Sequence, residues 1–278
     1  AGPNAGTEPS MADEVSYQIQ GRMALIRLER PDALNALTLP MIAAVKAYAE
    51  AAERDPDVTA ICITGAGRGF CAGIDMSILV DSTGGGAPAA EPETVRARPA
   101  LFSFLLDISK PVLAAINGTV AGGGFVLAMM CDMRFMAETA TISTIFAKRG
   151  LIAEHGMSWL LPRLIGLSRA LDVLWSSRKI DATEALRLGL VDRVVPDDAL
   201  IATVQAYVDD LAAHCAPQSL AHMKAQLLRH LQTDFDTAAH EADRLMATVL
   251  RHPDATEGAM SFVERRPPRF TPWTGPTR

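Results

Sequence analysis

In this sequence of 278 residues, two glycine-rich stretches are the segments best suited to take part in catalysis or binding. The first, Gly65–Asp75, follows a run of β-branched residues, and the second, Asn117–Asp132, follows the apolar run Pro111–Ile116. Within the second, three consecutive glycines, Gly122 to Gly124, precede a segment typical of a buried helix. A turn from strand to helix leaves backbone N–H groups without partners, and these could stabilise a negative charge on a thioester oxygen. Alternatively, the glycines only allow helix and strand to approach closely.

Neither stretch matches a better-known glycine motif. A phosphate-binding P-loop would end in Gly-Lys-Ser or Gly-Lys-Thr, and a dinucleotide site would need an acidic residue at the right distance to hold a ribose; the sequence has neither. It also has no Gly-x-Ser-x-Gly elbow, which argues against a serine hydrolase. Two glycine turns that each give one N–H to the same oxygen would instead stabilise an enolate or a tetrahedral oxyanion without a metal or a cofactor.

Composition and charge favour a globular protein. Apolar residues make up 49% of the chain and charged residues 21%, and the formal net charge is −6. No basic stripe suggests a nucleic-acid partner, and no apolar run is long enough to cross a membrane. The four cysteines lack paired spacing, so we expect reduced thiols in a cytoplasmic protein and no zinc site. Residues 1–14 lack the layout of a secretion signal and are expected to form a disordered tail.

Hydrophobic periodicity predicts an α/β core over residues 15–196 and a helical C-terminal region over residues 197–278. The core pattern opens with a hairpin and continues with a helix capped by Thr38. Val80–Glu93 is of low complexity and is expected to be a mobile loop, and Arg96–Asp107 is expected to be a helix. The C-terminal helices carry apolar stripes but are too short to bury them alone, so they must pack on the core or on another subunit.

Three segments, Ile63–Asp75, Asn117–Asp132 and Ala182–Val195, together resemble the enoyl-CoA hydratase/isomerase family, the crotonase superfamily. The resemblance extends from about Val15 to Phe270. It implies a spiral of repeated ββα units with a C-terminal helical region that drives formation of a homotrimer, or of a hexamer made of two trimers. It also implies a coenzyme A thioester as the substrate, with no separate cofactor.

By position, the backbone N–H groups of Ile74 and Gly123 resemble those that form the oxyanion hole in this family. Ile74 occupies the variable place in the family's Ala-Gly-x-Asp pattern, and Gly123 is the middle glycine of the triplet. Further residues resemble those that bind the substrate: Ala33, Leu34, Ala72, Gly73, Asp75 and Gly122. Phe262 and Arg265 resemble the late aromatic and basic residues that reach the nucleotide portion of coenzyme A; the alternative is an ordinary amphipathic helix end.

Two positions depart from the family's pattern. Hydration of an enoyl thioester in this family uses two glutamates, and the corresponding residues here are Val126 and Phe146. Paired carboxylates suit hydration because one can act as a base while the other supplies an acid. An alkyl group and a phenyl ring can do neither. We therefore expect these side chains to contact the substrate without moving a proton.

One acid remains nearby. Glu154 lies eight residues beyond Phe146, where family members that isomerise dienoyl thioesters, hydrolyse hydroxyacyl thioesters or displace aryl halide place a carboxylate. In an apolar pocket built from Val126, Phe146 and Trp159, desolvation would raise the pKa of Glu154. The carboxyl group could then move a proton at a carbon next to the thioester carbonyl.

These residues leave several functions open. A single acid/base favours isomerisation of a double bond, because the same group can remove and return a proton. Alternatively, Glu154 activates water in a hydratase, a dehydratase or a thioester hydrolase. A third hypothesis is an inert protein that binds acyl-CoA. Glu154 could also be a solvent-facing partner of Arg149 or Arg163, and His155 is expected to be a structural hydrogen-bonding residue.

Overall fold

The computed structural model describes residues 14–75 and 100–275. Six strands form the larger sheet, in spatial order β1 (Val15–Gln20), β2 (Met23–Leu28), β3 (Ala60–Gly65), β5 (Val112–Ile116), β7 (Met133–Ala137) and β10 (Arg193–Val195). Four strands form the smaller sheet, in order β4 (Gly69–Cys71), β6 (Thr119–Ala121), β8 (Thr141–Ser143) and β9 (Ile180–Asp181). Among the strand pairs of the described residues, only β1–β2 and β8–β9 are antiparallel.

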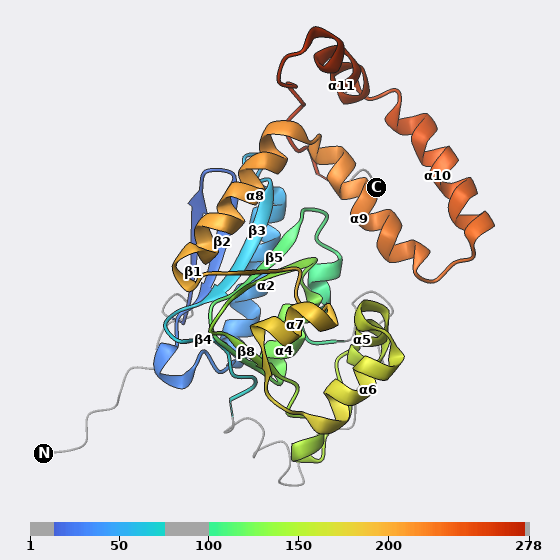
Figure 1. Cartoon of the computed structure of the whole chain (residues 1–278). Helices are drawn as coiled ribbons and strands as arrows, with labels where there is room; N and C mark the ends of the chain where they lie inside the picture. The colour runs from blue at the N-terminus through green and yellow to red at the C-terminus, as the bar shows by residue number, and fades with distance from the viewer. Residues whose placement is uncertain (1–13, 76–99, 276–278) are drawn as a thin grey trace, which may run out of the picture.

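Successive strands alternate between the two sheets. The pairs β3–β4, β5–β6 and β7–β8 each place one strand in the larger sheet and the next in the smaller one. The chain therefore winds around a common axis as it advances, and the parallel pairing of neighbouring turns follows from this winding. The predicted spiral of ββα repeats is confirmed (Figure 1).

Nine α-helices complete the described part of the chain. They are α2 (Leu39–Arg54), α4 (Gly123–Met130), α5 (Met157–Ile165), α6 (Leu167–Ser176), α7 (Ala182–Leu188), α8 (Leu200–His214), α9 (Pro217–His230), α10 (Phe235–Val249) and α11 (Pro253–Glu264). Thr38 caps α2 as predicted, because its Oγ1 accepts a hydrogen bond from the Met41 N–H at 3.2 Å. All eight residues of α4 are buried, so this helix forms the centre of the core.

The helix predicted over Arg96–Asp107 is wrong for its described part. There the chain forms only the short 3₁₀ helix η2 (Ser103–Leu106). Phe102, which precedes it, has a left-handed backbone with φ of 59° and is buried, so packing of the ring overrides the local helical pattern. The disordered tail expected over residues 1–14 and the loop expected over Val80–Glu93 lie outside the described residues, apart from Glu14.

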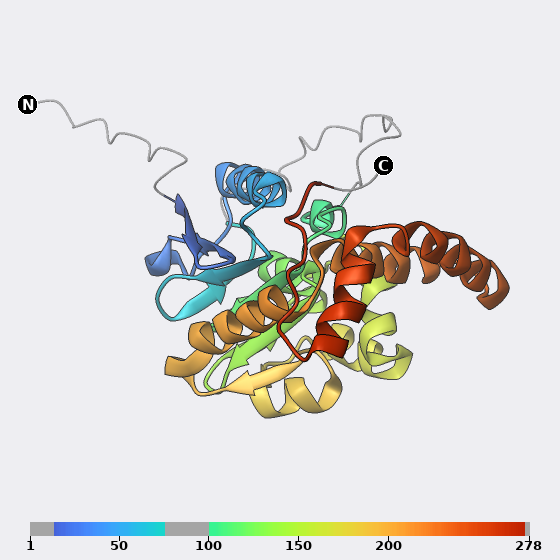
Figure 2. The same ribbon diagram turned by 90° about the horizontal axis from the view of Figure 1, so that it is seen from above.

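The C-terminal helices divide into a docked part and a projecting part. Helix α8 packs on the larger sheet through Leu200, Val204 and Val208. Helix α9 is tied to the core by Lys224, whose Nζ lies 2.6 Å from Asp132 Oδ2 at the end of α4. Helix α10 has no buried residue, and α10 and α11 project from the body of the molecule (Figures 1 and 2). The predicted packing on the core therefore holds for α8 and α9.

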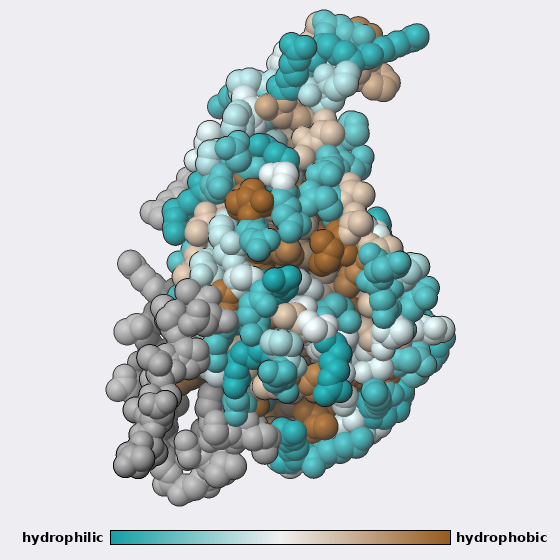
Figure 3. All heavy atoms as spheres, turned by 90° about the vertical axis from the view of Figure 1, so that its left-hand side faces the viewer, coloured by the Kyte–Doolittle hydropathy of each residue, from teal (hydrophilic) through white to brown (hydrophobic). Residues whose placement is uncertain are grey.

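The molecular surface differs between faces. On the side of β1 and β2, hydrophilic residues predominate and apolar residues form separate small patches (Figure 3). By contrast, α9 to α11 expose a set of large apolar side chains: Met223, Leu227, Leu231, Phe235, Met246, Leu250, Met260, Phe262 and Val263. Among the described helices, none has the length and apolar content needed to cross a bilayer.

Candidate active site

The two glycine-rich stretches meet because β4 and β6 are parallel neighbours. Cys71 at the end of β4 pairs with Val120 in β6, so the chain leaves both strands at the same edge of the smaller sheet. A Cβ atom added to Gly73 would lie 3.3 Å from the Gly123 nitrogen, and one added to Gly123 would lie 3.4 Å from the Ile74 nitrogen. The structure thus brings Ile74 and Gly123 together at one point.

Both N–H groups are available to a ligand. Leu37 pairs with the strand-like segment around Ile74: its N–H donates to the Gly73 carbonyl at 2.7 Å, and its carbonyl accepts from the Asp75 N–H at 3.0 Å. This pairing uses the Gly73 carbonyl and the Asp75 N–H, which flank the Ile74 N–H. Gly123 is the first residue of α4, where an N–H group has no acceptor within the helix. Among the described residues, neither N–H donates a hydrogen bond. An oxyanion hole requires this arrangement.

Glycine is also needed for close packing in the same stretch. A Cβ atom on Gly124 would lie 2.1 Å from the Cys71 carbonyl oxygen, so α4 can begin against β4 only with glycine there. Gly122 has a φ of 49° and Gly73 a φ of 107°, which also favour glycine. The two interpretations of the glycine triplet therefore apply to different residues, with close packing at Gly124 and an available N–H group at Gly123.

Two asparagines hold the first glycine loop. Asn35 is fully buried, and its Nδ2 donates to the carbonyls of Ala66 at 3.0 Å and Gly69 at 2.7 Å. Asn117 accepts from the Gly65 N–H at 3.0 Å and donates to carbonyls of the same loop. No local sequence pattern predicted a role for either side chain. The available signal was an asparagine in each segment that flanks the glycine loop.

The structure assembles most of the residues predicted to bind the substrate. The Ala72 N–H donates to the Leu34 carbonyl at 2.9 Å, which places Ala33 and Leu34 beside the turn that contains Gly73 and Asp75. Gly122 lies in the same group, since a Cβ on it would lie 3.9 Å from the Gly73 Cα.

Phe262 and Arg265 are not part of this assembly within one chain. They lie at the end of α11, and Phe262 is 86% exposed. Figure 1 shows α11 at the opposite end of the molecule from β4 and α4. A single chain therefore does not bring these two residues to the loop site.

Val126 and Phe146 are both removed from solvent. Val126 is fully buried one turn into α4, and Phe146 is 2% exposed. The ring of Phe146 packs edge-on against Phe125, with centroids 6.4 Å apart and an interplanar angle of 79°. Neither side chain can exchange a proton, and both are enclosed by apolar packing.

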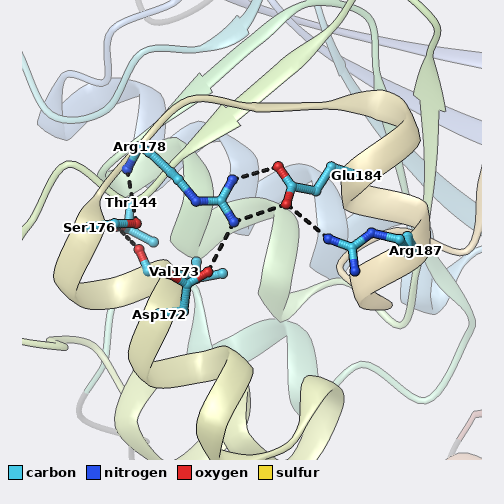
Figure 4. Close-up of polar contacts among 7 residues, drawn as sticks. All are labelled: Thr144, Asp172, Val173, Ser176, Arg178, Glu184 and Arg187. Carbon is cyan, nitrogen blue, oxygen red and sulfur yellow. Dashed lines mark hydrogen bonds and ion pairs between the residues drawn. The ribbon is translucent and has the colours of Figure 1, made fainter.

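The chain that leads to Phe146 is anchored to α6. Thr144 Oγ1 donates to the Val173 carbonyl at 3.1 Å. Helix α6 is joined in turn to α7 by Arg178, whose Nη2 lies 3.0 Å from both Asp172 Oδ2 and Glu184 Oε1 (Figure 4). Arg187 adds a further contact to the same Glu184 carboxylate. This network fixes the support on which the Phe146 segment rests.

Glu154 lies in the loop before α5. The loop turns tightly, with the Glu154 N–H donating to the Ile152 carbonyl at 2.9 Å. The Glu154 side chain is 37% exposed, and its Oε1 lies 3.8 Å from His155 Nε2. Arg163, one expected partner, instead stacks on Trp159, with its guanidinium carbon 4.2 Å from the ring centroid. In the single chain, Glu154 is therefore less enclosed than the sequence led us to expect.

Two hollows flank this loop. One, of about 450 Å³, is lined in part by Met130, His155 and Trp159, and the other, of about 410 Å³, is lined in part by Phe146 and Ile152. Met130 ends α4, whereas the candidate oxyanion hole lies at the start of α4. Seven residues of α-helix span about 10 Å, so one helix links the two parts of the site.

Cys71 is the thiol nearest to the candidate oxyanion hole. Burial raises its pKa to about 12, and a hydrogen bond with the Gly73 backbone only partly offsets this effect. A thiol with this pKa is almost entirely protonated at neutral pH and is a poor nucleophile. The electrostatics at this position therefore argue against covalent catalysis by Cys71.

Comparison with known proteins agrees with this geometry. The family model described as enoyl-CoA hydratase/isomerase matches residues 18–272. A probable enoyl-CoA hydratase of Mycobacterium bovis is 36% identical over 251 residues, covering 90% of this chain and 95% of the relative. The 1,2-epoxyphenylacetyl-CoA isomerase of Escherichia coli is 32% identical over 265 residues, covering 94% and 99%. The crystal structure of a probable enoyl-CoA hydratase/isomerase from Mycobacterium abscessus superimposes with a TM-score of 0.82 at 27% identity, covering 94% and 99%. The chain therefore belongs to the enoyl-CoA hydratase/isomerase family of enzymes, the crotonase superfamily.

Proposed function

We propose that this enzyme moves a carbon–carbon double bond in an acyl-CoA thioester. In this mechanism the backbone N–H groups of Ile74 and Gly123 hold the thioester oxygen, and Glu154 is the general acid/base. The observation that carries the proposal is the combination of two converging N–H groups with apolar residues at the two glutamate positions. One carboxyl group suffices for isomerisation, because it can take a proton from one carbon and return it to another.

The proposed reaction has two steps. The ionised carboxylate of Glu154 removes a proton from the α carbon of a β,γ-unsaturated thioester, or from the γ carbon of an α,β-unsaturated one, and the electron pair of the broken C–H bond delocalises onto the thioester oxygen as an enolate. The two N–H groups stabilise this charge, which forms fully only along the reaction path. The protonated carboxyl then returns the proton to the other end of the allylic system, which restores the carbonyl and leaves the double bond shifted.

Water-dependent chemistry is the second candidate function. The side chain of Glu154 is 37% exposed, so water can reach it, and relatives carry the name enoyl-CoA hydratase. In this alternative Glu154 activates water for hydration, for the reverse dehydration, or for hydrolysis of the thioester. Isomerisation remains favoured because hydration by the family's usual route needs two carboxylates. One relative is named 1,2-epoxyphenylacetyl-CoA isomerase, so the relatives include an isomerase of a CoA thioester that acts on an epoxide.

Turnover in deuterium oxide separates these functions. Enoyl- and dienoyl-CoA substrates should acquire deuterium at the α or γ carbon and yield shifted double bonds, whereas a hydroxyacyl or free-acid product would contradict isomerisation. E154Q should lower kcat by about 10² to 10⁴-fold, and E138Q, a matched change at an exposed turn, should not. If wild type and E154Q were equally inert but still bound acyl-CoA, the protein would be a binding homologue.

We also propose that the enzyme acts in the cytoplasm as a homotrimer, or as a dimer of trimers. The exposed apolar side chains of α9 to α11 and the lack of buried residues in α10 support an interface there. In such an assembly, Phe262 and Arg265 would contact the coenzyme A of a neighbouring subunit. A monomeric mass in sedimentation equilibrium would contradict this proposal.

A further inference from the structure

We infer that Arg30 is a positioning residue of the oxyanion hole. Its guanidinium group holds the peptide of Ile74 in place and offsets the charge of Asp75. The inference rests on the proposed role of Ile74 and Gly123. Arg30 lies in the loop before α2, far in sequence from both glycine stretches, and the sequence pattern gave it no such role.

The guanidinium group joins the two segments that form the Leu37–Ile74 bridge. Arg30 Nη1 donates to the Ala36 carbonyl at 2.6 Å and to Asp75 Oδ2 at 3.1 Å. Ala36 directly precedes Leu37, and Asp75 directly follows Ile74. One nitrogen therefore connects both sides of the bridge that leaves the Ile74 N–H available.

Arg30 is itself held from other sides. Its Nε lies 3.1 Å from Glu14 Oε1, and the other oxygen of Glu14 accepts from Thr38 Oγ1 at 2.7 Å. The Arg30 N–H donates to Asn35 Oδ1 at 2.9 Å, so the asparagine that binds the first glycine loop also fixes the arginine backbone. The Arg30 side chain is only 25% exposed, and such a partly buried, multiply bonded guanidinium is well suited to fix a loop.

The charge of Asp75 adds a second requirement. A carboxylate on the residue after Ile74 opposes the formation of a negative charge on an oxygen bound to the Ile74 N–H. The Arg30 guanidinium, 3.1 Å from that carboxylate, offsets this repulsion. An ordinary exposed ion pair would have no influence on the stability of a bound enolate. Stabilisation of an enolate is therefore the property that tests the inference.

Acetoacetyl-CoA provides a suitable probe, because the enolate of a bound β-ketoacyl thioester can be detected by its ultraviolet absorbance without turnover. We expect R30Q to lower the enolate-to-keto ratio of the bound probe about tenfold. R30Q/D75N should regain part of this loss, because the negative charge that Arg30 offsets is then removed. R27Q removes an exposed arginine from a pair with Glu29 and is the matched control that should leave the ratio unchanged. Affinity for a coenzyme A thioether, which has no thioester carbonyl, should stay constant in R30Q and R27Q.

A folded R30Q protein with the wild-type ratio would overturn the inference, as would an equal loss of thioether and acetoacetyl-CoA binding. If R30Q does not fold, R30K replaces it: lysine keeps the charge but lacks the planar fork, so an intermediate loss is expected and a wild-type ratio overturns the inference equally. The proposed isomerase activity is tested separately, because the enolate of this probe forms without a shift of the double bond. A loss of enolate in R30Q together with full turnover in E154Q would leave this inference intact and reject the isomerase.

Discussion

The two regions that the proposed chemistry requires are built in opposite ways. The turn Ala72–Asp75 and the start of α4 follow the parallel neighbours β4 and β6, and backbone pairs and the side chains of Asn35 and Arg30 fix them. The loop Gly150–Gly156, which carries Glu154, lies at the surface. No described atom would lie within 4 Å of a Cβ added to Gly150, and Ile152 in the same loop is 80% exposed.

This difference follows from what each region must do. Stabilisation of an oxyanion depends on fixed N–H groups, and a small displacement removes much of the benefit. A carboxyl group on a loop can instead be placed, removed or moved by local substitutions that leave the core intact. In the proposed mechanism, the fixed region therefore provides what every enolate-forming reaction on a thioester needs. In the same proposal, the loop region decides which reaction follows.

Among substitutions that disturb the packing of the two regions, the largest effect is expected at Gly124. In G124A the new methyl group would collide with the Cys71 carbonyl, which is 2.1 Å away and part of the backbone, so α4 must move away from β4. We expect turnover to fall by about 10² to 10³-fold, as for loss of an oxyanion-hole donor. The matched change G150A meets no neighbour and should cost only about 1 kcal/mol through its φ of 69°. Measurements of turnover and of the free energy of unfolding in urea, made on G124A and G150A, test this prediction. Equal losses would contradict the contrast between the regions.

A smaller effect is expected from Asn35. N35A removes three hydrogen bonds in a fully buried position and leaves the Ala66 and Gly69 carbonyls and the Arg30 N–H without this partner. We expect the free energy of unfolding to fall by about 2–4 kcal/mol. I152A, a change at an exposed side chain of the other region, should stay within about 0.5 kcal/mol. Chemical denaturation of both variants tests this, and a stable N35A protein would show that Asn117 holds the first glycine loop without Asn35.

The same contrast explains what the sequence could predict. Local patterns predicted the hairpin, the Thr38 cap, α4 and the alternation of strands and helices, because each depends on neighbouring residues. The family resemblance predicted the spiral. The pairing of Ile74 with Gly123 was expected from that resemblance, and the parallel neighbours β4 and β6 supply its structural basis. The catalytic role of this pair stays a prediction.

Interactions between distant residues left no local pattern. Asn35 bonds to carbonyls 31 and 34 residues away, and Arg30 to a carboxylate 45 residues away, so neither contact has a spacing that periodicity can detect. The partial exposure of Glu154 depends on how α5 and the loop pack, which the sequence does not show. At Phe102, a left-handed backbone interrupted a segment that had the pattern of a helix.

The smallest effect is expected at His155, in the loop region. Its backbone has a φ of 51°, its Nδ1 accepts from the Leu101 N–H at 3.4 Å, and its Nε2 lies 3.8 Å from Glu154. Asparagine tolerates this backbone conformation, and both side-chain contacts are long, so H155N should change stability by no more than about 0.5 kcal/mol.

Its turnover should then change by only a few-fold, because Glu154 keeps its place in the loop. H155V is the matched contrast: a β-branched residue is strained at this φ, and we expect a loss of about 1–2 kcal/mol. Urea denaturation and kcat of the two variants test this ordering. If H155N lost as much activity as E154Q, His155 would be required for proton transfer, just as Gly124 is required for the packing of α4. The loop would then be a second rigid part of the site, and the division between a fixed region and a variable one would fail.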